Sequence, residues 1–125
     1  MIENTALYKS KKFATKIIRL GKFLHEQKKE FVLSKQILRS GTSIGANLAE
    51  SECASSRKDF LNKKYIALKE TNETLYWLDS LRNSGYLTQP QYESVYSDCM
   101  EIKKMLVATT KTISMEKPQT SNLRP

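Results

Sequence analysis

The sequence predicts an all-α protein that folds as an antiparallel up-down-up-down four-helix bundle. Glycine and proline are rare: the 125 residues include 4 Gly and 3 Pro, and Pro118 and Pro125 lie close to the end of the chain. Apolar residues recur at intervals of three, four and seven through four long segments, which is the spacing of a helix face. Capping and turn residues separate the segments, and short connections make successive helices antiparallel neighbours. A chain of this length has room for one domain with one core.

The first helix is predicted from about Thr5 to Gln27. Thr5 is a suitable N-cap because its hydroxyl can accept a hydrogen bond from a free backbone N–H at the helix start. Helical spacing places one set of residues on the face that packs in the core: Leu7, Phe13, Ala14, Ile17, Leu20, Gly21 and Leu24. The opposite side is basic, so this segment is a single amphipathic helix.

The second helix is predicted from about Val32 to Glu52. Its core line is Ile37, Gly41, Ile44 and Leu48, flanked by Leu38, Gly45 and Ala49. Small residues spaced four apart at 41, 45 and 49 let a neighbouring backbone come close. A glycine inside a helix costs roughly 1 kcal/mol relative to alanine. We therefore expect tight packing within the subunit along this stripe.

The third helix is predicted to begin at Ser56, with Asp59 three residues later in a pattern typical of a capping box. Leu61, Leu68 and Leu75 follow at seven-residue intervals. Gly85 stands where a left-handed glycine commonly ends a helix.

The fourth helix is predicted to begin at Thr88, with Gln91 as its capping partner. Its apolar stripe is Tyr92, Val95, Tyr96, Cys99, Ile102, Leu106, Thr109 and Ile113. The sequence thus predicts a four-helix bundle over residues 1–115 and a flexible C-terminal tail over residues 116–125, which have little apolar surface to bury.

Positive charge is concentrated in the first third of the chain. The whole sequence has 21 Lys and Arg against 13 Asp and Glu, a net charge of +8. Residues 1–39 hold ten of these bases and three acids, which leaves 10 − 3 = +7. A one-sided positive field attracts polyanions. The candidate nucleic-acid-binding residues form a stripe along the first helix with one extension: Lys9, Lys12, Lys16, Arg19, Lys22 and Lys35. A solvated helix face with no ligand is the alternative.

Several classes of protein are disfavoured by the sequence. It has no apolar run near the roughly 20 residues of a membrane span, nor an apolar signal segment, so we expect a cytoplasmic location. Cys53, Cys99 and the single His25 form no metal-binding spacing, and no Glu is followed three residues later by His. The letters S-x-x-K at Ser55–Lys58 occur in a predicted helix start. We therefore expect no catalytic residues, no metal, no cofactor and no small-molecule substrate.

Three segments together resemble a known family. They are residues 43–50 (SIGANLAE), 58–60 (KDF) and 66–78 (IALKETNETLYWL), followed by the turn at residues 85–87 (GYL). They resemble the bacterial four-helix bundle proteins encoded within intervening sequences of large-subunit ribosomal RNA genes, over roughly residues 6–115. Many members have Pro where this chain has Gly45 and Gly where it has Ser51. Both differences are local.

The resemblance implies a bundle that assembles into a ring, a homopentamer. It also implies similarity to the accessory protein of diversity-generating retroelements, a basic pentamer that binds RNA and a reverse transcriptase. RNA or DNA, and a protein partner such as a reverse transcriptase, are thus the partners that the resemblance implies, with no role for a membrane.

A candidate subunit interface follows from two helix faces. On the third helix, Ile66, Glu70, Glu73 and Trp77 share one face, with two large apolar residues around two carboxylates. On the second helix, the matching residues are Arg39, Ser43, Asn47 and Glu50, and Arg39 is placed to pair with a glutamate of a neighbouring subunit. The alternative is a wide core face with Trp77 at its edge.

The leading hypothesis is a non-enzymatic homo-oligomer, most simply a pentamer, that binds nucleic acid, RNA in particular, through a repeated basic face. The alternative is an adaptor or scaffold ring that binds a protein partner and has no nucleic-acid role.

Overall fold

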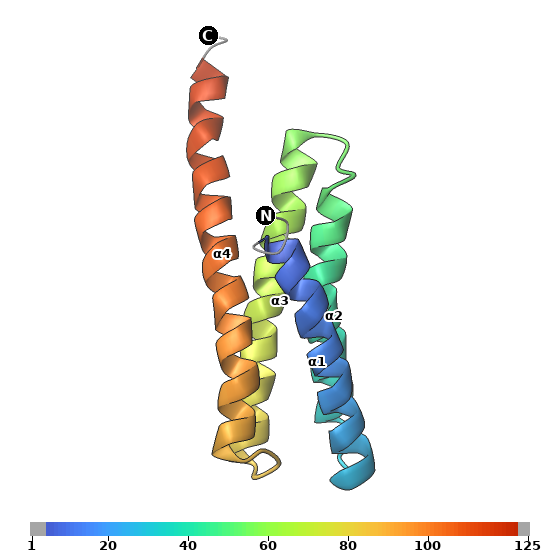
Figure 1. Ribbon diagram of the computed structural model, residues 1–125. Helices are drawn as coiled ribbons and strands as arrows, with labels where there is room; N and C mark the ends of the chain where they lie inside the picture. Colours follow the sequence, from blue (N-terminus) through green and yellow to red (C-terminus); the bar gives the residue numbers. More distant parts are fainter. Residues whose placement is uncertain (1–4, 123–125) are drawn as a thin grey trace.

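The computed structural model describes the backbone of residues 5–122 and the side chains of residues 5–115. The four helices are α1 (Ala6–Gln27), α2 (Leu33–Ser51), α3 (Arg57–Asn83) and α4 (Gln89–Asn122). Five residues join each helix to the next. Successive helices run in opposite directions, and the C-terminal end of α4 extends past the ends of the other three (Figure 1). The predicted all-α four-helix bundle is confirmed.

Each helix packs against two others, and the four helices together enclose one core. α1 and α3 both pack against α2 and α4, whereas the backbones of helices at opposite corners do not approach closely in the described part of the chain. The largest fully buried side chains come from all four helices: Ile17, Leu24, Ile37, Ile44, Leu48, Leu78, Leu81, Ile102 and Leu106. No described helix is long and apolar enough to cross a membrane.

Helix starts and ends follow the capping chemistry that the sequence predicts. The hydroxyls of Thr5 and Ser56 each accept a hydrogen bond, of 3.0 Å, from the backbone N–H three residues on. Thr88 and Gln91 form a reciprocal capping box at the start of α4, with bonds of 2.9 and 3.3 Å. Gly85 has a φ of 85°, as a left-handed residue after α3 requires.

The start of α2 uses a cap that the sequence pattern did not indicate. Glu30 is 8% exposed, and its carboxylate accepts hydrogen bonds from the N–H groups of Val32, Leu33 and Ser34 at 3.2, 2.9 and 2.6 Å. A negative charge beside three free N–H groups also complements the helix dipole. This acidic side chain therefore has a structural role in positioning α2 against α1.

The glycine stripe of α2 packs against α1, as predicted. A Cβ on Gly41 would lie 2.8 and 2.9 Å from the two Cγ atoms of Ile17, and one on Gly45 would lie 3.0 Å from the Ser10 hydroxyl. The rest of the prediction for this helix needs correction. Leu38 and Ala49, which were placed beside the core line, are both exposed; Leu38 lines an outer groove together with residues of α1.

α4 continues beyond the end that the sequence predicts. The helix was expected to end near residue 115, and its backbone continues to Asn122. Residues 123–125 and the side chains of residues 116–122 lie outside the described part of the chain. The flexibility of the tail at residues 116–125 stays a prediction.

Candidate nucleic-acid and subunit interfaces

The first part of the predicted basic stripe lies beside α4. Lys9, Lys12, Lys16 and Arg19 line one shallow hollow together with two acids of α4, Asp98 and Glu101. Lys9 pairs with Glu101 at 3.1 Å, and Lys16 pairs with Asp98 at 2.7 Å. The Lys16 ammonium also donates to the carbonyl of Ser94 at 3.1 Å.

These pairs change the charge that the stripe presents. Four bases and two acids leave 4 − 2 = +2 at this hollow. Lys12 and Arg19 are exposed, and neither takes part in an ion pair in the described part of the chain. They are therefore the cations of this hollow that are available to an external phosphate, while Lys9 and Lys16 also hold α1 against α4.

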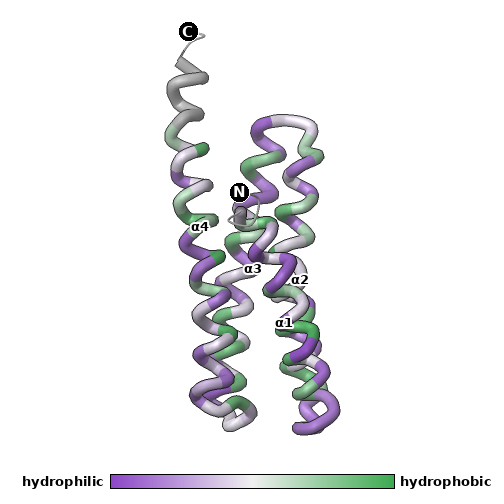
Figure 2. The backbone as a smooth tube through the Cα atoms, in the orientation of Figure 1, coloured by the Kyte–Doolittle hydropathy of each residue, from purple (hydrophilic) through white to green (hydrophobic). Residues whose placement is uncertain are grey.

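The remaining two basic residues lie elsewhere. Lys22 and Lys35 line a different groove, on the outer side of α1 and α2. Both are exposed. The adjoining turn between these helices is the most hydrophilic end of the bundle, with the run of polar residues from His25 to Glu30 (Figure 2). The six predicted residues thus form two groups rather than one continuous stripe.

The two faces predicted to meet between subunits already meet within one chain. Arg39 of α2 donates to Glu73 and, at 3.5 Å, to Glu70, both on α3. Lys63 of α3 donates to Glu50 at 2.7 Å, and this hydrogen bond raises the pKa of Lys63. The expected pairing of Arg39 with a neighbouring subunit is therefore replaced by a pairing between adjacent helices, which lie close enough for the long side chains to reach.

The rest of this face is half-buried. Ile66, Glu70, Glu73 and Trp77 are all partly covered, as are Ser43 and Asn47. Ser43 and Asn47 each donate to a carbonyl one turn earlier in α2, at 2.7 and 2.9 Å. We call these six residues, together with Arg39 and Glu50, the α2–α3 face.

Trp77 lies at the edge of the core. Its ring packs against the core cluster, its Nε1 donates to Glu73 at 3.1 Å, and the ring of Tyr76 meets it edge-on. The fully buried line of α3 passes through Ala67, Thr74 and Leu78. The row that carries Trp77 therefore lies next to the core rather than opposite to it. This is the arrangement of the wide-core interpretation, and a role in assembly stays a prediction.

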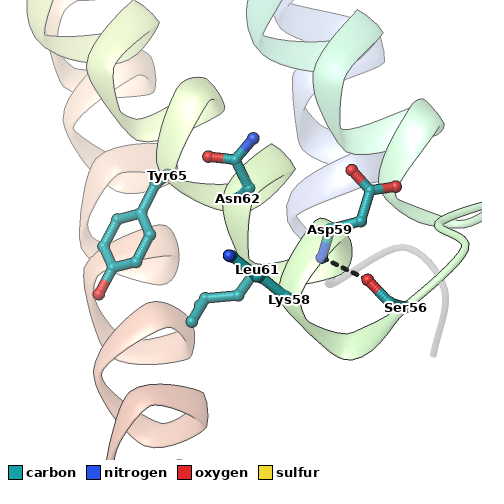
Figure 3. A pocket seen from close by; sticks show the side chains of 6 residues that line it. All are labelled: Ser56, Lys58, Asp59, Leu61, Asn62 and Tyr65. Carbon is teal, nitrogen blue, oxygen red and sulfur yellow. Dashed lines mark hydrogen bonds between the residues drawn. The ribbon is translucent and has the colours of Figure 1, made fainter.

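The hollow at the start of α3 is lined in part by residues that cap this helix. It is lined by Ser56, Lys58, Asp59, Leu61, Asn62 and Tyr65 (Figure 3). The Asp59 N–H donates to the Ser56 hydroxyl at 3.0 Å, and the Asp59 carboxylate accepts from the Ser55 N–H at 3.3 Å. The S-x-x-K letters therefore belong to a helix start, as the sequence indicates.

Side chains that could bind a metal ion are scattered in the described part of the chain. Among residues 5–115, no three His, Cys, Asp or Glu side chains are grouped closely enough to share a metal ion. His25 is exposed, and its ring meets that of Phe31 edge-on at 4.7 Å between centroids. Cys99 is buried, and burial raises the pKa of its thiol to about 12, whereas Cys53 is exposed.

Sequence reasoning missed two features of these surfaces. One is the pair of acids on α4, Asp98 and Glu101, which their spacing of three places on one helix face. The other is the exposed apolar residues between α1 and α2. A signal for the latter was the doublet Ile17-Ile18, since adjacent residues in a helix cannot both face the same core.

The fold and these surfaces define an all-α four-helix bundle with a basic first half. Comparison with known proteins then identifies its family: the 23S rRNA-intervening sequence proteins match residues 3–108, and the chain belongs to this family. A crystal structure of a protein of unknown function from the S23 ribosomal protein family of Bacteroides thetaiotaomicron VPI-5482, solved at 1.70 Å, is similar in fold, with a TM-score of 0.86 and 56% identity. The match covers 89% of this chain and 99% of that one. No curated protein matches significantly.

Proposed function

We propose that this protein is a non-enzymatic homo-oligomer, most simply a pentamer, that binds nucleic acid through a basic face repeated in each subunit. The observation that carries the proposal is the set of exposed cations along α1 and the start of α2. Lys12, Arg19, Lys22 and Lys35 are exposed, and none takes part in an ion pair in the described part of the chain. Such cations release counterions when they bind phosphates.

RNA is the favoured nucleic acid. The family is named for intervening sequences of 23S ribosomal RNA, and the similar crystal structure is of a protein assigned to the S23 ribosomal protein family. Few aromatic side chains are interleaved with the basic residues, so stacking on unpaired bases is not indicated. We infer that the target is the phosphate backbone of a structured RNA, recognised with little regard to base sequence.

The test of the basic face compares two charge reversals. Lys12→Glu with Arg19→Glu removes two exposed cations of the face without breaking the pairs of Lys9 and Lys16 with α4. The matched control, Lys69→Glu with Lys104→Glu, makes the same charge change at exposed positions on α3 and α4. Filter binding of a structured RNA at low salt should fall at least tenfold for the first variant and much less for the control. Equal losses of RNA binding in both variants would show that net charge alone controls binding, and would reject a specific role for the basic face.

We propose the α2–α3 face as the contact between subunits, and this contact can be tested without disturbing the core. Asn47 is half-buried there and donates only to its own helix, so Asn47→Lys leaves the subunit folded while placing a charge on the proposed contact. Asn72→Lys is the control, because Asn72 is exposed on the far side of α3. Light scattering should give an oligomer for the wild type and the control, and a particle near 14.4 kDa for Asn47→Lys. A wild-type mass of one subunit, or no change in Asn47→Lys, would contradict this interface.

A further inference from the structure

An apolar groove runs along the outer side of α1 and α2. Ile18 is 53% exposed, Phe31 51% and Leu38 38%, and all three line this groove. Ile18 follows the fully buried Ile17, so it lies outside the stripe that α1 turns toward the core. Leu38 likewise lies outside the core line of α2. Three large apolar side chains are thus gathered on one exposed surface, away from both the core and the α2–α3 face.

The floor of this groove is made of small residues. Gly21 of α1 and Ser34 of α2 also line the groove, and both are buried. A Cβ added to Gly21 would meet nothing nearer than Leu38, at 3.9 Å. The groove between these two antiparallel helices is therefore shallow, and its apolar surface comes from the three large side chains that line it. A third helix can lie in such a groove with its apolar side chains between those of α1 and α2.

The edges of the groove are positively charged. Lys22 lies on the α1 edge and Lys35 on the α2 edge, both exposed and neither in an ion pair in the described part of the chain. Among the described residues, Glu26 is the one acid that lines the groove. Lys28 and Lys29 follow in the adjoining turn. A ligand that complements this surface has an apolar centre and negative flanks.

We propose that this groove binds an amphipathic helix of another protein, whose apolar face contacts Ile18, Phe31 and Leu38 and whose flanking Asp and Glu side chains meet Lys22 and Lys35. A second copy of this chain fits less well, since it has a net charge of +8 and two acids of its α4 are already paired with lysines. A nucleic acid would leave the apolar side chains of Ile18, Phe31 and Leu38 without a matching partner. The inference does not depend on assembly or on RNA binding at Lys12 and Arg19, but it shares Lys22 and Lys35 with the proposed basic face, so a structured RNA and an acidic helix would compete for these two lysines.

The probe is a designed 18-residue helical peptide with Leu at positions i, i+3, i+4 and i+7 and Glu on both flanks. Two matched peptides replace the Glu residues with Lys, or shuffle the order so that the apolar face is lost. Fluorescence anisotropy with the full chain should give at least tenfold tighter binding of the acidic peptide than of either control. Amide chemical shifts should change around residues 18–22 and 31–38.

The protein variants are matched in the same way. Ile18→Glu should weaken binding of the acidic peptide at least tenfold, while Val107→Glu, at a position 42% exposed on α4, should leave it unchanged. Circular dichroism should show both variants folded, because both positions are exposed.

Three results would overturn the inference. Equal binding of the acidic and basic peptides would show that charge complementarity does not contribute to binding in this groove. A structured RNA that shifts the groove amides when the acidic peptide does not would make the groove a nucleic-acid site. A wild-type oligomer that Ile18→Glu dissociates would make it a contact between copies of this chain.

Discussion

Replacing Gly41 with alanine tests a close approach between α1 and α2. The added Cβ would lie 2.8 and 2.9 Å from the two Cγ atoms of Ile17, and 3.3 Å from its Cβ. Ile17 is fully buried and branched at Cβ, so its side chain has little freedom to rotate away. Either the side chain leaves its rotamer or the two helices separate, and both weaken the core.

The magnitude follows from two opposing effects. Overpacking a well-packed core costs about 1–3 kcal/mol, and the rigid surroundings of Ile17 favour the upper end. Alanine recovers about 1 kcal/mol of helix propensity. We expect Gly41→Ala to lower the free energy of unfolding by about 2 kcal/mol. Gly21→Ala is the control: its Cβ meets Leu38 at an ordinary 3.9 Å. It should stabilise the protein by about 0.5–1 kcal/mol.

The assay is urea unfolding followed by circular dichroism at one fixed protein concentration, because assembly would couple stability to concentration. The two variants should differ by about 3 kcal/mol, or roughly 9–15 °C in Tm for a chain of this size. In an Ile17→Leu background, which lacks the second branch at Cβ, Gly41→Ala should cost less. The packing argument is refuted if Gly41→Ala is as stable as Gly21→Ala, or if Ile17→Leu leaves its cost unchanged.

Three further predictions concern single side chains. Cys53 is exposed and the Cys99 thiol is buried with a pKa raised to about 12, so a thiol reagent at pH 8 should label one cysteine in the native protein and two in urea; fast double labelling would contradict this. Burial and the hydrogen bond to Asp79 raise the pKa of Tyr92 to about 12. The neutral phenol therefore contributes to the free energy of unfolding fully below pH 10, and this contribution is lost as the pH rises through 12. The difference between ultraviolet titrations of the wild type and Tyr92→Phe should give the pKa of Tyr92, and Asp79→Asn should lower that pKa. A pKa near 10 for Tyr92 in the wild type would refute this prediction. Glu30→Ala leaves three N–H groups of α2 without their acceptor and should cost about 2 kcal/mol in urea unfolding, with Glu30→Gln costing less; equal stability of Glu30→Ala and wild type would exclude the cap.

The four helices could be predicted from the sequence because the residues that start and end them act on neighbours only a few positions away. Thr5, Ser56 and Thr88 cap helices through residues three positions away, and Gly85 ends one through its own backbone angle. The cap at Glu30 was missed because its carboxylate reaches the helix from outside the first turn, a position that the common capping pattern does not include.

The candidate interfaces were harder to predict because they depend on which helix covers which face. Periodicity placed Glu70, Glu73 and Trp77 on one side of a helix, but it could not say that α2 lies beside that side and brings Arg39 to it. In the same way, the charge count of α1 did not include Asp98, which neutralises Lys16 only once α4 closes the bundle. Contacts between distant segments thus decided how much of the predicted surface is available.

The salt dependence of RNA binding tests the repeated basic face most directly. Even if all six predicted cations of one subunit bound phosphates, the slope of log K against log salt would be no steeper than roughly −5 for a duplex. Because an oligomer presents the same cations several times, we expect a slope steeper than about −6 for a structured RNA. A slope no steeper than about −5, which one subunit could supply, or no binding at 50 mM salt, would contradict phosphate recognition by several subunits together.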